Sequence, residues 1–221
     1  MLALGMIAAL AMPGTAQATP QLGDLGVKQS MSVKASNGES LEGKDLRAIQ
    51  LATYTAASVD GNTIVGYDLT TNTALASDIT AAAKAAGATD TNLTVNGKND
   101  PMVWVVKNLT DSRSDPWSGK LRNFCNSLAK QTNFAKQDGT AVSTLSQDKA
   151  TMSTGNVLVP GIYAIVDRTP ATTTLSSGTA IKTTASIMMM NGTAVNGVNQ
   201  LRTAGGTTPV SYTHLRAHET R

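Results

Sequence analysis

Residues that could hold a metal or act as nucleophiles are scarce in this sequence. The 221 residues include one cysteine and two histidines, and only 4% are aromatic. A disulfide needs a second cysteine, and a cysteine-based zinc site needs several cysteine and histidine ligands, so the composition excludes both. The shortage of histidine also argues against a Ser-His-Asp hydrolase. We expect no metal and no cofactor.

Charged residues are few as well. They make up 15% of the chain, and the formal net charge is +3. A charge this small does not indicate a nucleic acid partner. Thr, Ala, Gly and Asn are abundant instead, which is typical of a polar β protein. The length fits one domain whose core is large enough to fold without covalent staples.

The first residues have the pattern of a secretory signal peptide. Leu2–Met12 form an apolar run, Pro13 and Gly14 break it, and a small-x-small motif ends at Ala18. The pattern predicts a leader over residues 1–18 that is cleaved between Ala18 and Thr19, although its positively charged start is missing. The run is too short to span a membrane, so membrane contact is expected only through the leader before cleavage. The alternative is an N-terminal core helix.

Residues 210–221 resemble translated sequencing-adapter DNA. Both histidines, His214 and His218, lie in this tail, and its removal lowers the formal net charge from +3 to +2. The alternative is a mobile natural tail, which would be equally without function. We therefore expect residues 19–29 to be a polar lead, residues 30–200 to form the domain, and residues 201–221 to be a disordered end.

Alternating apolar and polar residues predict several strands. In the stretch 30–35, Met31 and Val33 lie on one face and Lys34 on the other. Asp60-Gly61 predicts a hairpin turn, and Pro160-Gly161 predicts a turn into a buried strand. Strands are expected over residues 30–35, 47–54, 54–59, 63–68, 161–167 and 183–190, and the Thr- and Ser-rich stretch 169–184 is expected to be a loop.

Two helices are expected between these strands. Ser77 could cap the first, whose apolar residues share one face until Gly87 ends it. Asp115 and Pro116 could begin the second, which would bury Cys125 on its apolar face as an inert thiol. The pattern leaves open whether residues 102–106 form a strand or a helix. The whole order favours a mainly β fold, a β-sandwich with helical insertions.

Two segments, Ser32–Tyr54 and Gly155–Asp167, are similar to segments of Gram-positive fimbrial subunits. The chain resembles the N-terminal domain of a sortase-assembled major pilin of the isopeptide-forming type, across nearly all of the stretch after the leader. This resemblance implies an Ig-like (Cna-like) β-sandwich with two short helices inserted. It also implies a secreted subunit that a pilus-specific sortase joins to other pilin subunits and finally to the cell wall.

The resemblance further implies two candidate residues for a crosslink inside the domain. Members of the family form Lys–Asn isopeptide bonds with help from a buried acid, which requires burial to shift the pKa values of the amine and the acid. Lys34 lies where the bonding lysine would fall, and Asn191 lies where its partner would fall. The position that often carries the assisting Glu holds Asn156 and Val157 instead. The alternative is an ordinary surface lysine and a turn asparagine.

The sequence thus favours a non-enzymatic structural subunit of a cell-wall-attached pilus. The competing hypothesis is a surface adhesin domain that binds a host glycan or matrix protein. Its candidate contact residues are Trp104, Trp117 and Tyr163, although the apolar neighbours of each also suit core packing.

Overall fold

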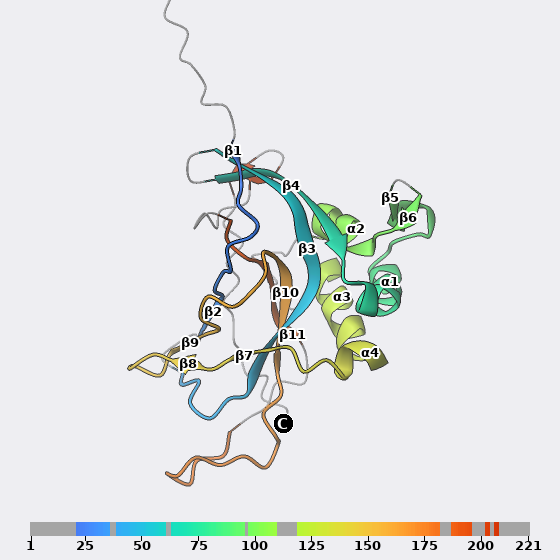
Figure 1. Cartoon of the computed structure of the whole chain (residues 1–221). Coiled ribbons are helices and arrows are strands. Elements are labelled where there is room, and N and C mark those ends of the chain that lie inside the picture. The colour runs from blue at the N-terminus through green and yellow to red at the C-terminus, as the bar shows by residue number, and fades with distance from the viewer. Residues whose placement is uncertain are drawn as a thin grey trace, which may run out of the picture.

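The protein is mainly β, with several antiparallel sheets and a few short helices (Figure 1). The computed structural model describes residues 21–35, 39–60, 63–95, 97–109, 119–181, 187–195, 202–203 and 206–207. The expected leader with its cleavage site at Ala18 and Thr19 lies outside the described residues, and so does the tail 210–221.

A six-stranded antiparallel sheet forms the centre of the fold. Its longest strand, β3, pairs with four others, while β10 lies between β3 and β11. The strands of this larger sheet are β1 (Gln21–Leu22), β3 (Leu46–Asp60), β4 (Thr63–Thr71), β7 (Thr140–Val142), β10 (Gly161–Asp167) and β11 (Ile187–Gly192).

Both faces of the larger sheet are covered where β3 pairs with β10. On β3, Leu46 and Ala48 point into one apolar cluster, and Ile49 and Leu51 point into another. Successive side chains of a strand leave opposite faces, so a strand between two cores is expected to be mostly apolar on both faces. All seven residues of β10 are buried, as its continuous apolar run predicts.

A smaller sheet covers one face of the larger one. It is made of β2 (Ser32–Lys34), β9 (Thr151–Ser153) and β8 (Thr144–Leu145), in that order. Val33 and Met152 of this sheet pack with Tyr163 and Ile165 of β10. Two sheets therefore face each other across one apolar core.

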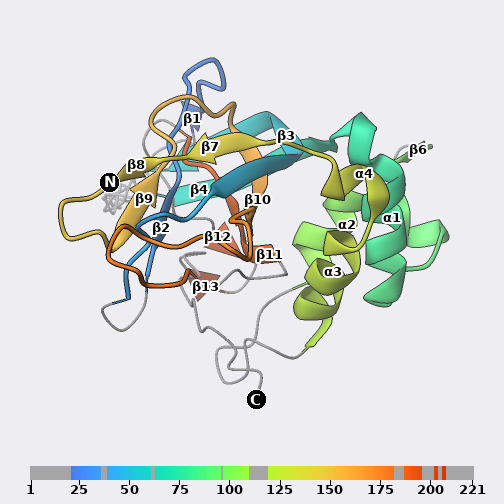
Figure 2. The same ribbon diagram turned by 90° about the horizontal axis from the view of Figure 1, so that it is seen from below.

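The helices cover the opposite face of the larger sheet (Figure 2). All the helices in the described part of the chain come from the segment between β4 and β7. This segment contains α1 (Ala76–Ala85), α2 (Pro101–Asn108), α3 (Gly119–Ala129), α4 (Thr132–Ala135), the 3-10 helices η1 (Thr73–Leu75) and η2 (Thr91–Leu93), and the short hairpin of β5 (Thr94–Val95) and β6 (Lys98–Asn99). A further short pair, β12 (Arg202–Thr203) and β13 (Gly206–Thr207), lies near the end of the described chain.

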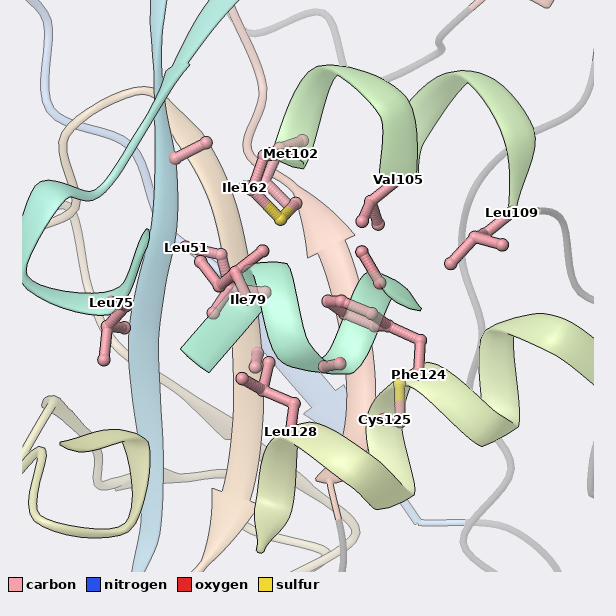
Figure 3. Packing of buried hydrophobic residues seen from close by; sticks show 14 of the residues in the cluster. Leu51, Leu75, Ile79, Met102, Val105, Leu109, Phe124, Cys125, Leu128 and Ile162 are labelled. Carbon is pink, nitrogen blue, oxygen red and sulfur yellow. The ribbon is translucent and has the colours of Figure 1, made fainter. Parts of the chain in front are cut away.

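The helical layer packs through a few large side chains. Phe124 and Leu128 of α3 are fully buried and point toward α1 (Figure 3). Cys125 is buried beside them, which confirms the prediction of a buried thiol. Fully burying a side chain of this size contributes roughly 1.5–3 kcal/mol of hydrophobic free energy, so these few residues stabilise the helices on the sheet.

The prediction of two helices is wrong in number, because the described residues contain α2 and α4 as well. The expected helix after Ser77 is confirmed as α1, although it begins at Ala76 and Ser77 lies inside it. The second expected helix corresponds to α3, while its expected start at Asp115 and Pro116 lies outside the described part of the chain. The open stretch 102–106 is helical in α2, which has Pro101 in its first turn.

A contact with a residue of strand β4 explains the start of α2. The backbone N–H of Met102 donates to the Thr71 hydroxyl at 3.0 Å, and the Thr71 hydroxyl donates to the Asp100 carboxylate. The first N–H groups of a helix have no partner within the helix. Here Thr71 of β4 supplies a hydrogen-bond acceptor for one of these N–H groups. No local pattern in residues 102–106 could have predicted a helix start that depends on a distant strand.

The strand predictions agree more closely with the structure. Met31, just before β2, and Val33 within it are buried, and Lys34 at the end of β2 is exposed. The hairpin is confirmed by the antiparallel pairing of β3 with β4 up to Asp60 and Thr63. The late strand is confirmed in its described part, where β11 extends to Gly192.

Candidate functional site

Lys34, one member of the expected crosslink, lies at the surface. Its neighbour Val33 points into the core between the sheets, so the Lys34 side chain points outward. The cation is close enough to Asp148, in the turn between β8 and β9, to contribute to the lowering of the pKa of that carboxyl, whose largest cause is a hydrogen bond from Ser146. Lys34 thus has the setting of an ordinary surface lysine.

Asn191, the other member, lies on the larger sheet. It is half-buried on β11 directly opposite Tyr163 of β10, and its side-chain oxygen accepts from the backbone N–H of Gly192 at 2.8 Å. The expectation of a turn asparagine is wrong, since Asn191 is in a strand. Lys34 and Asn191 thus belong to different sheets.

The expected adhesin contacts are buried where they are described. Trp104 on α2 is 9% exposed and Tyr163 on β10 is 4% exposed. The Tyr163 hydroxyl donates to the carbonyl of Val159 at 2.9 Å, and burial raises the pKa of this tyrosine to about 12. Core packing is therefore confirmed for both, and Trp117 lies outside the described residues.

The structure brings together a different lysine and acid. The Lys44 ammonium and the Asp167 carboxylate are 2.8 Å apart, and their side chains are 12% and 0% exposed. Lys44 precedes β3 and Asp167 ends β10, so the salt bridge joins two segments more than a hundred residues apart. Its burial sets it apart from the exposed pair of Lys149 and Glu42.

Backbone hydrogen bonds hold the same two segments side by side. The N–H of Arg168 donates to the carbonyl of Asp45 at 2.7 Å, and the N–H of Asp45 donates to the Thr169 hydroxyl at 2.8 Å. The N–H of Thr169 in turn donates to the Asp167 carboxylate at 2.9 Å. The arrangement extends the β3–β10 pairing beyond the ends of both strands and fixes the carboxylate next to Lys44.

The sequence held one usable signal for this pair. Asp167 follows six consecutive residues of a predicted buried strand, and a carboxylate at such a position needs a cationic partner or several hydrogen bonds. The identity of the partner depends on the register of β3 against β10, which composition and spacing do not give.

A second buried carboxylate has a structural explanation. Asp78 on α1 is 6% exposed and accepts hydrogen bonds from the Asn133 side chain at 3.0 Å and from the backbone N–H of Phe134 at 2.8 Å. Asp78 therefore satisfies an N–H at the start of α4 and joins the two helices.

Within the described ranges, no group of three or more histidine, cysteine or acidic side chains could hold a metal ion. Nor does any helix described there have both the length and the apolar character needed to cross a membrane. The chain matches no protein-family model, no curated protein and no solved structure.

Proposed function

We propose that this chain is a structural subunit of a cell-surface pilus, secreted and joined covalently to other pilin subunits by a pilus-specific sortase. We further propose that its two facing sheets are an Ig-like sandwich elaborated by a helical layer. The observation that carries the proposal is the placement of the two segments that resemble fimbrial subunits. Ser32–Tyr54 contains β2 and the first part of β3, and Gly155–Asp167 contains β10. These two segments pair with each other at the centre of the fold.

The burial of the paired strands β3 and β10 also supports the proposal. A fibre outside the cell needs subunits that resist unfolding, and this chain has one cysteine, so it cannot form an internal disulfide. The β3–β10 ladder is covered by apolar side chains on both faces, and the buried Lys44–Asp167 pair lies at its end. Burial excludes water, which would otherwise compete for the backbone hydrogen bonds.

The proposal does not depend on an internal crosslink. The Lys34–Asn191 bond needs a neutral, buried amine, whereas Lys34 is exposed. We expect the intact mass of the domain, purified from a heterologous host that attaches no sugar to it, to equal the mass of its sequence. A mass lower by one ammonia would instead establish a Lys–Asn bond.

The adhesin alternative is the weaker one, because Trp104 and Tyr163 are buried in the core. Immunogold electron microscopy of cells that carry the gene separates the two hypotheses, with antibodies raised against the purified chain. Label repeated along filaments is the result that we expect. Label at filament tips alone would favour the adhesin. Labelled cells without filaments would contradict the proposal that the chain is a subunit of a pilus shaft.

A further inference from the structure

One exposed loop of the molecule is rich in threonine and serine and carries no charge. Residues 170–180, here called the hydroxyl loop, follow β10 and form the orange segment at the lower end of Figure 1. Seven of its eleven residues are Thr, Ser or Gly, and the other four are Pro170, Ala171, Leu175 and Ala180. Neither the loop nor the residues on its two sides, Thr169 and Ile181, carry a charge. The proposed shaft function does not use this segment.

Three hydroxyls of this loop are exposed to solvent. Thr172, Thr174 and Ser176 are exposed, and their side chains make no hydrogen bond within the described part of the chain. Ser177 and Thr179, by contrast, bond to each other at 3.1 Å. Exposed loops carry many of the modified and binding residues of proteins because a rigid scaffold presents them to partners.

The loop is held in place although its tip is exposed. The side chains of Leu175 and Ile181 lie against Gly43, just before Lys44, where any larger residue would collide with Ile181. Within the loop, the N–H of Leu175 donates to the carbonyl of Thr179, and the N–H of Ile181 donates to the carbonyl of Thr173, both at 2.9 Å. The apolar side chains thus point inward, which leaves the hydroxyls facing solvent.

We propose that the hydroxyl loop is an acceptor site for O-linked sugar, with Thr172, Thr174 and Ser176 as the acceptors. Segments rich in Ser and Thr with Pro are typical of O-glycosylated surfaces, and attached sugar is bulky and needs an exposed acceptor. This inference goes beyond the proposed function and does not require it.

The reaction is a group transfer without oxidation or reduction. The donor is a hexose or N-acetylhexosamine activated as a phosphate ester, and a glycosyltransferase of the producing cell is the catalyst. The hydroxyl oxygen forms a bond to the anomeric carbon while the bond from that carbon to the phosphate oxygen breaks. The phosphate ester leaves with the electron pair, and the transferase base takes the hydroxyl proton.

The sequence makes the test direct, because Arg168 and Lys182 flank the loop and trypsin releases residues 169–182 as one peptide. The full chain is purified from cells that carry the gene, and this peptide is sequenced by electron-transfer mass spectrometry. We expect added hexose or N-acetylhexosamine masses on Thr172, Thr174 or Ser176. A peptide with the mass of its sequence alone, or sugar confined to other residues, would overturn the inference.

A variant provides the second measurement. Thr172→Val, Thr174→Val and Ser176→Ala together should abolish the added mass on the peptide, whereas Thr144→Val, at an exposed threonine on β8, should leave it unchanged. Unchanged circular dichroism shows that the triple variant is folded. If the triple variant kept the full added mass, the three hydroxyls would not be the acceptors.

Discussion

At the scale of single residues, two salt bridges of similar length differ in their surroundings. Lys44 and Asp167 are 2.8 Å apart and nearly inaccessible to solvent, whereas Lys149 and Glu42 are 2.7 Å apart with side chains 50% and 39% exposed. Water screens the exposed pair, and removal of one partner leaves the other solvated. Removal of Lys44 would leave the buried Asp167 carboxylate without this cation.

We therefore predict that Lys44→Met lowers the free energy of unfolding by about 3 kcal/mol. Lys149→Met is the matched control and should lower it by less than about 1 kcal/mol. Urea denaturation of the two variants measures both values. Equal losses would show that burial of the Lys44 pair contributes nothing to stability.

Tyr163 gives a prediction about alkaline pH. Burial raises its pKa from the ordinary 10.0 to about 12 in the folded protein. Below pH 10 both the folded and the unfolded chain keep this proton, so the contribution to stability is complete there. As the pH rises from 10 to 12, the unfolded chain releases the proton first and the folded state loses stability.

Tyr163→Phe should therefore reduce the slope of unfolding free energy against pH in this window, by up to about 1.4 kcal/mol per pH unit. Urea denaturation at a series of pH values measures the slope. Some slope remains in the variant, since burial also raises the pKa values of Tyr54 and Tyr67. An identical slope in both proteins would contradict the effect assigned to Tyr163.

At the scale of elements, the start of β10 depends on a close approach to β3. A Cβ atom added at Gly161 would fall on the backbone carbonyl oxygen of Ala52, which cannot move without disturbing the ladder. The sequence predicts a turn at Pro160-Gly161, whereas the structure has a bend at Pro160 and begins β10 at Gly161. The requirement for glycine could not be predicted, because the atom that excludes a side chain belongs to the neighbouring strand.

Gly161→Ala should accordingly destabilise the protein by about 2 kcal/mol or more, as overpacking of a rigid site does. Gly26→Ala is the control, since its nearest neighbour would be the flexible Asp24 side chain at 3.1 Å. Thermal unfolding followed by circular dichroism compares the two variants. Equal midpoints would mean that β10 can shift away from β3 at little cost.

The elements that could be predicted are those whose signal is local. The alternation at Met31 and Val33, the hairpin after Asp60 and the apolar face of α3 are local patterns, and the structure contains all three. The start of α2 depends on Thr71, and the Lys44–Asp167 pair depends on strand register. Contacts between distant segments decide both, so the candidate site was less predictable than the elements around it.

At the scale of the whole molecule, three layers share one central sheet. The helices between β4 and β7 cover one of its faces, and the small sheet of β2, β9 and β8 covers the other. This order gives β3 and β10 a core on each side, and these strands lie in the two segments that resemble fimbrial subunits. The proposal of a pilus subunit rests on this overlap between the two central strands and the two segments that resemble fimbrial subunits.

Covalent polymerisation of the subunits can be measured in a cell-wall extract of cells that carry the gene. The extract is boiled in detergent, separated by electrophoresis and probed with antibody against this chain. We expect a ladder of high-mass bands that collapses to the single subunit when the pilus sortase gene is deleted. A single band at the subunit mass in both strains would contradict covalent polymerisation.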